Sequence, residues 1–120
     1  MPEQDGRFDR KHRLKRPEEF RQVFRSSCRS ADGYLLVIAR QNGLQYARLG
    51  LAISRKKIRL AVDRNSLKRQ LRESFRQHKQ LLSGLDVVVV SLNPPPCNKN
   101  RVLTRNLTGH WQKISKCRNS

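Results

Sequence analysis

Residues 46–92 read YARLGLAISRKKIRLAVDRNSLKRQLRESFRQHKQLLSGLDVVVVSL, and this stretch decides the fold. Residues 46–54 alternate between apolar and small or polar side chains, which is the period of a β-strand. Residues 86–92 are a short β-branched apolar run, typical of a buried strand. Because a long segment of helical periodicity separates them, we expect a strand–helix–strand unit with parallel pairing.

The intervening helix has two distinct arcs, with Asp63 as its predicted N-cap. At about 100° per residue, its apolar side chains and one histidine fall within about 80° and form a core-facing stripe. This stripe consists of Leu67, Leu71, Phe75, His78 and Leu82. The neighbouring arc carries cations and one amide, and we name it the basic arc. It consists of Asn65, Lys68, Arg69, Arg72, Arg76 and Lys79.

The charge of the chain indicates a polyanionic partner. The sequence has 27 Lys and Arg against 9 Asp and Glu, a formal net charge of +18. A helix face that is merely solvated would spread its cations and interleave acids, whereas the basic arc crowds like charges together. Arginine predominates over lysine, which suits bidentate phosphate recognition. We therefore expect nucleic acid to bind the basic arc.

Three further elements flank this unit. Pro17 opens a helix that we expect to end near Ser26 or Ser27, with Glu18 and Glu19 at the positive end of its dipole. Residues 34–40 (YLLVIAR) are a predicted buried strand, followed by turn chemistry. Residues 100–116 keep helical spacing, and Trp111 in this helix is a predicted core residue.

Several functional classes are excluded by what the sequence lacks. No apolar run approaches the roughly 20 residues of a membrane span, and the N-terminus lacks a signal-peptide centre, so the predicted location is the cytoplasm. Cys28, Cys97 and Cys117 fit no disulfide framework or zinc pattern and are predicted to be reduced thiols. The three histidines are predicted to be solvated or packed. We find no paired carboxylates and no Ser/His/Asp constellation that would support hydrolysis, so neither catalytic nor metal-binding residues are predicted.

A family resemblance gives the basic arc a partner. The run 61–76, AVDRNSLKRQLRESFR, resembles the signature of the protein subunit of bacterial ribonuclease P: an Arg-Asn pair, then Lys-Arg, Arg-Glu and Phe-Arg at fixed intervals. Ser66 stands where that signature usually has its second arginine. Segments around Arg13-Leu14, Arg48–Leu51 and Ser54–Lys57 extend the resemblance over roughly residues 13–114.

The resemblance implies a fold. It is a single compact α+β domain with the order α-β-β-β-α-β-α and a left-handed crossover, although about 98% of such crossovers are right-handed. We expect this domain to span residues 13–116. Residues 1–12 are expected to be a flexible basic arm, and residues 117–120 a C-terminal tail.

The resemblance also implies an activity that lies outside this chain. In ribonuclease P an RNA that uses Mg²⁺ removes the 5′ leader of precursor tRNA, and the protein is non-catalytic. The expected partners are this catalytic RNA and precursor tRNA, with no DNA and no membrane. Docking on the catalytic RNA is implied for Arg64, Asn65, Lys68, Arg69, Arg72 and Arg76.

A second site is implied in a cleft between the first helix and the sheet, where the single-stranded leader would lie. Its matching residues are Phe20, Phe24, Arg48 and Lys56. Aromatic rings beside cations suit such a strand. Two rival functions stay open at this stage: a structural ribosomal-type RNA-binding protein, and a DNA-binding regulator whose recognition helix is residues 64–76.

Overall fold

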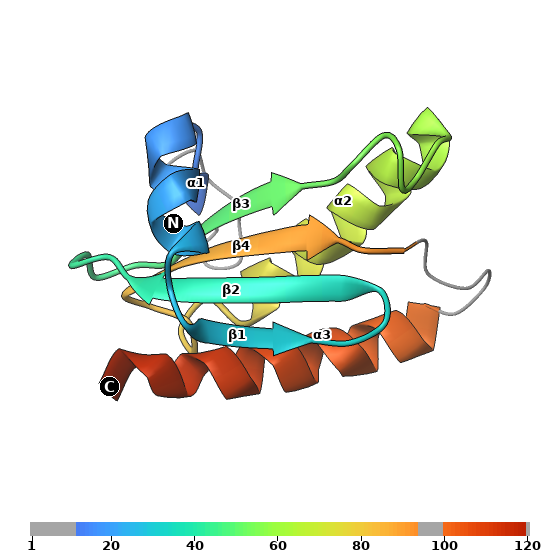
Figure 1. The fold of residues 1–120 in the computed structure, drawn as a ribbon. Coiled ribbons are helices and arrows are strands. Elements are labelled where there is room, and N and C mark those ends of the chain that lie inside the picture. The colour runs from blue at the N-terminus through green and yellow to red at the C-terminus, as the bar shows by residue number, and fades with distance from the viewer. Residues whose placement is uncertain (1–11, 94–99, 120) are drawn as a thin grey trace, which may run out of the picture.

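Three α-helices and a four-stranded sheet make up the part of the chain described by the computed structural model, residues 12–93 and 100–119 (Figure 1). The elements follow the predicted order. They are α1 (Pro17–Phe24), β1 (Cys28–Ala31), β2 (Leu35–Gln41), β3 (Arg48–Ala52), α2 (Ala61–Gln77), β4 (Leu85–Ser91) and α3 (Asn100–Ser115), with a final 3-10 helix at Lys116–Asn119.

The sheet has the strand order β1-β2-β4-β3. β3 pairs with β4 in parallel, with Leu49 opposite Val87, which confirms the pairing expected from the sequence. β2 is antiparallel to both β4 and β1. The periodicity of the residues gave no sign of β1, since its four residues, CRSA, carry no apolar alternation. Only the resemblance supplied this third strand before α2.

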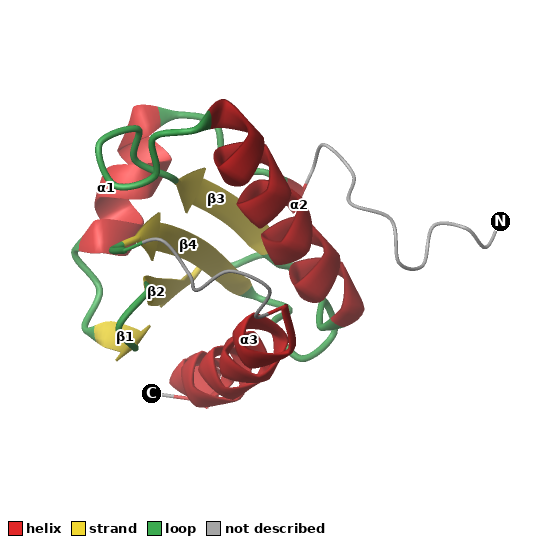
Figure 2. Ribbon diagram, turned by 90° about the vertical axis from the view of Figure 1, so that its right-hand side faces the viewer, coloured by secondary structure: helices red, strands yellow, loops and turns green. Residues whose placement is uncertain are grey.

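The crossover from β3 to β4 has the rare hand. In the view of Figure 1 the chain runs along β3, returns through α2 behind the sheet, and continues into β4 below β3. This path is left-handed, as the resemblance implied. As a consequence α2 lies on the same face of the sheet as α3, while α1 lies on the opposite face (Figure 2).

The two faces of the sheet are covered unequally. We call the face under α2 and α3 the closed face; its core includes the fully buried Trp111, Phe75 and Leu71. The prediction that Trp111 is a core residue is therefore confirmed. We call the other face the open face, because the short helix α1 covers only part of it. Its buried cluster consists of Leu14, Val23, Ile38 and Val88.

Two predicted helix limits were wrong. α2 begins at Ala61 and not after Asp63, because the N–H groups of Asp63 and Arg64 both donate to the carbonyl of Leu60 (3.1 Å each). Asp63 lies in the first turn, where its charge still suits the helix dipole. α1 ends at Phe24, before the predicted Ser26, whose hydroxyl donates to the Ala39 carbonyl (2.5 Å) and accepts from the N–H of Cys28 (3.1 Å).

The prediction of reduced thiols was wrong for two of the three cysteines. Cys28 on β1 and Cys117 in the final 3-10 helix form a disulfide, with their Cα atoms 6.2 Å apart. Because 89 positions separate them, only the folded chain brings them together. Cys97 lies outside the described residues.

Order at the two ends extends beyond the predicted domain limits. His12 is buried and its Nδ1 lies 2.8 Å from the Ala47 carbonyl, while residues 1–11 of the predicted arm lie outside the described residues. At the other end, the predicted tail begins inside the 3-10 helix. Within the described residues, no helix is both long enough and apolar enough to cross a membrane.

Candidate nucleic-acid interface

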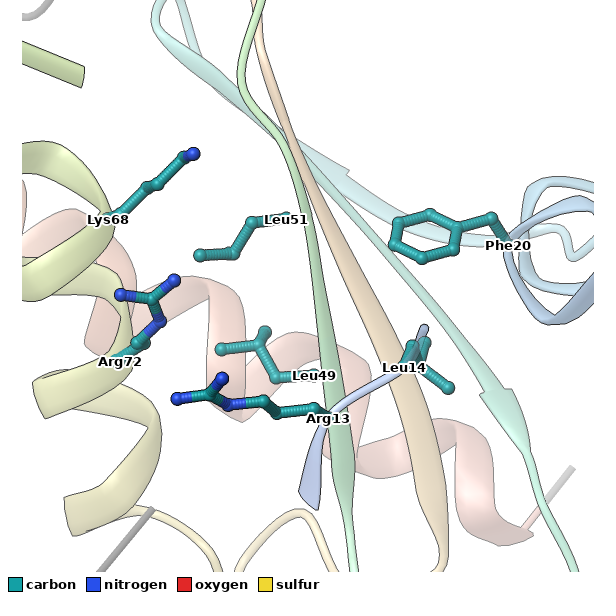
Figure 3. A pocket seen from close by; sticks show the side chains of 7 residues that line it. All are labelled: Arg13, Leu14, Phe20, Leu49, Leu51, Lys68 and Arg72. Atoms are coloured by element: carbon teal, nitrogen blue, oxygen red, sulfur yellow. The ribbon is translucent and has the colours of Figure 1, made fainter. Parts of the chain in front are cut away.

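A groove runs along β3, the strand at the edge of the sheet, between α2 and the segment that leads into α1 (Figure 3). That segment is held against β3 by its backbone. Arg13 and Leu49 form an isolated parallel β-bridge, and the Leu14 N–H donates to the Leu49 carbonyl (2.9 Å). We call this the edge groove. It is lined by Arg13, Leu14, Phe20, Leu49, Leu51, Lys68 and Arg72.

Cations from two distant parts of the sequence face each other across the edge groove. Figure 3 shows Lys68 and Arg72 reaching from α2 toward the strand, with Arg13 approaching from the other chain segment. Burial lowers the pKa of Arg72, and the neighbouring charge of Arg13 lowers it further. A bound phosphate would relieve this repulsion, since an anion between the two side chains attracts both positive charges.

The floor of the edge groove is apolar, and one glycine shapes it. Phe20 lies so close to Gly50 that a Cβ on Gly50 would stand 2.6 Å from the ring atom Cζ. Glycine therefore allows the ring to pack closely against β3, on the side of the strand opposite to Leu49 and Leu51 (Figure 3). An apolar floor with a cationic rim is what sequence-tolerant binding of single-stranded RNA requires.

Arg48, predicted to bind the leader, is engaged by two carboxylates. Its Nη1 donates to Glu19 Oε2 (3.0 Å), and its Nε and Nη2 donate to Asp86 (2.8 and 2.7 Å). The hydrogen bond to Asp86 is the largest cause of its raised pKa. Arg48 therefore links α1 to the sheet. These contacts suit a residue that holds α1 in place better than a cation that is free to bind RNA.

Glu19 fixes the beginning of α1. Its Oε1 accepts the backbone N–H groups of Lys15 and Arg16 (3.2 Å each). Burial acts to raise the pKa of Glu19, but these N–H groups and Arg48 outweigh it, so the pKa is lowered. The Glu19 carboxylate thus caps α1, the helix that carries Phe20, and connects this helix to Arg48 on β3.

The basic arc is divided by the fold. Its members Lys68 and Arg72 line the edge groove, while Asn65 and Arg69 are exposed on the outer side of α2. Arg76 forms an ion pair with Glu73, whose hydrogen bond raises the pKa of Arg76. The sequence argument treated the arc as lacking acidic partners, and this pair corrects it.

The remaining predicted site residues lie apart from the edge groove. Arg64 donates from Nη1 to the carbonyls of Ile58 and Arg59 (2.9 and 2.8 Å), so it ties down the loop before α2. Phe24 lies at the far end of α1 and is 38% exposed. Lys56 is exposed in the turn after β3.

The edge groove thus brings together Phe20, Lys68 and Arg72, which sequence reasoning had divided between two sites. Four lining residues were missed as site residues: Arg13, Leu14, Leu49 and Leu51. For Arg13 a signal existed, because Arg13-Leu14 belongs to the family resemblance. Leu51 also lies in a segment of the resemblance, Arg48–Leu51, but strand alternation predicts that its side chain faces the core.

One polar cluster contains a serine, a histidine and an aspartate, whose proximity the sequence did not reveal. Ser30 Oγ lies 2.6 Å from His110 Nδ1, and His110 Nε2 lies 2.9 Å from Asp32 Oδ2. Ser30 and His110 are each only 5% exposed, so a substrate cannot reach the hydroxyl. Asp32 also accepts the N–H groups of Tyr34 and Leu35 (2.7 and 2.8 Å). The cluster therefore joins β1 to α3 and has no nucleophilic role.

No group of three His, Cys, Asp or Glu side chains that could hold a metal ion occurs in the described residues.

Comparison with known proteins gives a consistent result. A family profile described as Ribonuclease P matches residues 8–115. The chain is 50% identical over 111 residues to the ribonuclease P protein component of Methylococcus capsulatus, covering 92% of this chain and 87% of the relative. It is 42% identical over 112 residues to that of Pseudomonas putida, covering 92% and 84%.

Solved structures agree with the sequence relatives. The ribonuclease P protein of Staphylococcus aureus superimposes with a TM-score of 0.74 at 26% identity, covering 82% of this chain and 91% of that one. The protein from Thermotoga maritima gives a TM-score of 0.68 at 28% identity, covering 84% and 96%.

Proposed function

The chain belongs to the ribonuclease P protein family, and from this premise we propose that it is the RNA-binding subunit that assists a catalytic RNA in removing the 5′ leader of precursor tRNA. Its membership makes it a subunit of a tRNA-processing ribonucleoprotein nuclease, with RNA as its partner. Leader removal, the identity of the RNA partners and the use of Mg²⁺ by the catalytic RNA are parts of the proposal.

The edge groove is the observation that carries this proposal. It combines Arg13 and Arg72, whose charges repel each other, with the partly buried ring of Phe20. Stacking of a base on an aromatic ring contributes about 1–3 kcal/mol, and the guanidinium groups would hold the adjoining phosphates. A single-stranded leader supplies both an unpaired base and its phosphates.

The division of the basic arc suggests how α2 serves two RNA molecules. Lys68 and Arg72 face the edge groove and the leader, whereas Asn65 and Arg69 face outward, toward the catalytic RNA. The protein's contribution is then charge neutralisation, which lets substrate and Mg²⁺ gather on a polyanionic ribozyme. No chemical step is assigned to a side chain of the protein.

Reconstitution tests the proposal. The purified protein, which we expect to be inactive alone, should restore cleavage of precursor tRNA by a bacterial ribonuclease P RNA at low Mg²⁺. Cleavage no faster than with RNA alone would refute it. Two variants separate the two RNA contacts. Phe20→Ala should weaken binding of precursor tRNA by the holoenzyme but not binding of leaderless tRNA, while Arg69→Ala should weaken assembly of the protein with the catalytic RNA.

A further inference from the structure

We propose that the outer side of α3 is a docking surface for double-helical RNA, and that a duplex segment of the catalytic RNA occupies it. We call it the α3 surface. It is formed by Arg105, Gly109, Gln112, Lys113 and Lys116, and it shares no residue with the edge groove or the basic arc. The identity of the RNA rests on the proposed function, whereas affinity for a duplex depends only on the surface itself.

The α3 surface lies opposite the side of the helix that packs on the sheet. That packed side carries Leu103, Leu107, Trp111 and Ile114, all of them buried. At about 100° per residue, the five residues of the α3 surface fall within an arc of about 100° on the other side of the helix. Figure 1 and Figure 2 both show α3 at the margin of the fold, with the sheet and α2 on one side of it. The α3 surface therefore faces away from the core.

The charge of the α3 surface is positive and unbalanced. No Asp or Glu occurs in α3 or in the final 3-10 helix. Arg105, Lys113 and Lys116 are exposed, and within residues 12–93 and 100–119 none of them forms an ion pair with a carboxylate. Like charges on one side of a helix repel one another, and a polyanion would relieve this repulsion.

Two nearby carboxylates are already engaged by other groups. Asp32 lies 2.9 Å from His110 Nε2 and accepts the N–H groups of Tyr34 and Leu35. Glu73, on the part of α2 that contacts Trp111, forms an ion pair with Arg76. These acids therefore leave the charge of the α3 surface available to a ligand.

Gly109 is the observation that indicates a close contact on this surface. Glycine within a helix is less stable than alanine, because it loses more backbone freedom on folding. At Gly50 the fold explains the glycine, since the Phe20 ring fills the space of a Cβ. At Gly109 a Cβ would meet nothing within 4 Å, and the backbone does not have a positive φ. A ligand that lies directly on the helix backbone would explain the missing side chain.

Double-helical RNA fits a cationic helix with a gap at its centre. Its minor groove is wide and shallow, and proteins bind it through 2′-hydroxyl and phosphate contacts. Gly109 would let the backbone of α3 approach the ribose groups, and the amide of Gln112 can both donate to and accept from a 2′-hydroxyl. Arg105 and Lys113, one turn before and after Gly109, would reach the phosphates on either side.

A single strand fits the α3 surface less well, because such strands are held by stacking on aromatic rings. No residue of the α3 surface is aromatic, and the ring of Trp111 is fully buried. From Arg105 to Lys116 the surface extends about 16 Å along the helix axis, with cations at both ends. Its chemistry therefore suits the backbone of a duplex better than unpaired bases.

The place of the α3 surface in the fold favours the catalytic RNA over the substrate. The edge groove, where we propose that the leader lies, borders β3 at one edge of the sheet. The helix α3 is tied to β1, the strand at the other edge, through His110 and Ser30. Asn65 and Arg69, on the outer side of the neighbouring helix α2, are already proposed to meet the catalytic RNA. One large RNA can contact both helices.

The variant Gly109→Ala provides the first test, because its two expected effects have opposite signs. Alanine should raise the melting temperature of the protein, since it stabilises an exposed helix. The added methyl group should nevertheless weaken binding of a blunt RNA hairpin of about ten base pairs roughly fivefold, because it would hold the helix away from the minor groove. Fluorescence anisotropy of a labelled hairpin with the purified protein measures this affinity. Unchanged hairpin affinity would overturn the inference.

A charge variant provides the second test. Arg105→Ala/Lys113→Ala should make the slope of log hairpin affinity against log salt shallower by about 1.8, because two phosphate contacts are lost. Binding of a single-stranded RNA of about ten nucleotides, which we assign to the edge groove, should be unchanged. The matched control is Arg21→Ala/Arg25→Ala, which removes two exposed cations of α1 on the opposite face of the sheet. An equal loss for both RNAs, or an equal loss in the control, would overturn the inference.

A third measurement separates this inference from the proposed function. The double variant Arg105→Ala/Lys113→Ala should assemble more weakly with the ribonuclease P RNA, while the assembled holoenzyme keeps its affinity for precursor tRNA. If reconstitution does not restore cleavage but the hairpin results hold, the proposed function fails and the duplex site stands. Unchanged assembly, or a loss confined to precursor tRNA, would overturn the assignment of the α3 surface to the catalytic RNA.

Discussion

The two faces of the sheet are built for different tasks. On the closed face, two long helices bury large side chains completely, and Trp111 Nε1 even finds a partner in the buried Ser74 hydroxyl (2.8 Å). On the open face, a helix of eight residues leaves Phe20 partly buried and Phe24 38% exposed. Apolar surface that is left open beside cations is surface for a ligand.

The comparison indicates that stability and binding are carried by separate residues. The closed face supplies most of the burial on which folding depends, so the open face can keep exposed rings and repelling arginines. The rare hand of the crossover makes this division possible, since it places α2 beside α3 and leaves α1 alone on the open face.

The largest expected effect is on the closed face. Trp111→Ala should lower the free energy of unfolding by about 3–5 kcal/mol, because it leaves a cavity and removes the partner of Ser74. Phe24→Ala, an aromatic truncation on the open face, should cost less than about 1 kcal/mol. Urea denaturation of both variants would measure the difference. Equal losses would break the proposed division between the faces.

A smaller effect is expected where the open face meets the edge groove. Gly50→Ala should destabilise the protein by about 1–3 kcal/mol, because the new Cβ would displace the ring of Phe20. The same change should reduce the preference for substrates with a leader. Gly33→Ala is the control, since a Cβ there meets nothing within 4 Å. If Gly50→Ala keeps both the stability and the leader preference of the wild type, the Phe20 ring can shift without affecting folding or leader binding.

The closed face was predictable from the sequence, because it follows from periodicity. The stripe of Leu67, Leu71 and Phe75 is buried as the angular count predicted, and so is Trp111. Its limits were less predictable: Leu82 is buried in the turn after α2, beyond the helix in which it was counted. Backbone hydrogen bonds decide where a helix stops, and periodicity does not report them.

The open face and the edge groove were less predictable, since they depend on contacts between distant segments. Arg13 and Arg72 are 59 positions apart in the printed sequence, yet the charge of Arg13 lowers the pKa of Arg72 through space. Arg48 looked like a free cation until Glu19 and Asp86 were found on either side of it. The sequence indicated which residue types bind RNA, but only the fold shows which of them have been neutralised.

The division of the basic arc can be tested by two arginines on the same helix. Arg72→Ala should weaken RNA binding about tenfold and make the slope of log affinity against log salt shallower by roughly one, because Arg72 lies in the edge groove without a carboxylate partner in the described structure. Arg76→Ala should have a smaller effect, since Glu73 already neutralises that side chain. Equal changes of slope would show that position on the arc, and not pairing, determines phosphate contact.

The smallest expected effect concerns acid stability and the polar cluster that ties β1 to α3. Burial acts to raise the pKa of Asp32, but the N–H groups of Leu35 and Tyr34 and the imidazole of His110 outweigh it, so the pKa lies below its ordinary value of 3.8. The folded state therefore prefers the ionised carboxyl, and the unfolded state binds the proton more readily. The resulting stabilisation should be complete above about pH 5 and should disappear as the pH falls through the lower, folded pKa.

Asp32→Asn removes this dependence, so the urea midpoint of the wild type should fall more steeply than that of the variant between about pH 5 and pH 3. Glu73→Gln is the control, because Glu73 is a fully exposed carboxylate whose pKa is lowered chiefly by its hydrogen bond with Arg76. Since water and salt weaken that exposed pair, its removal should change the slope less. If the urea midpoints of Asp32→Asn and the wild type fall in parallel, other carboxyl groups cause the acid sensitivity of the protein. The cluster would then connect β1 to α3 without contributing to the pH dependence of stability.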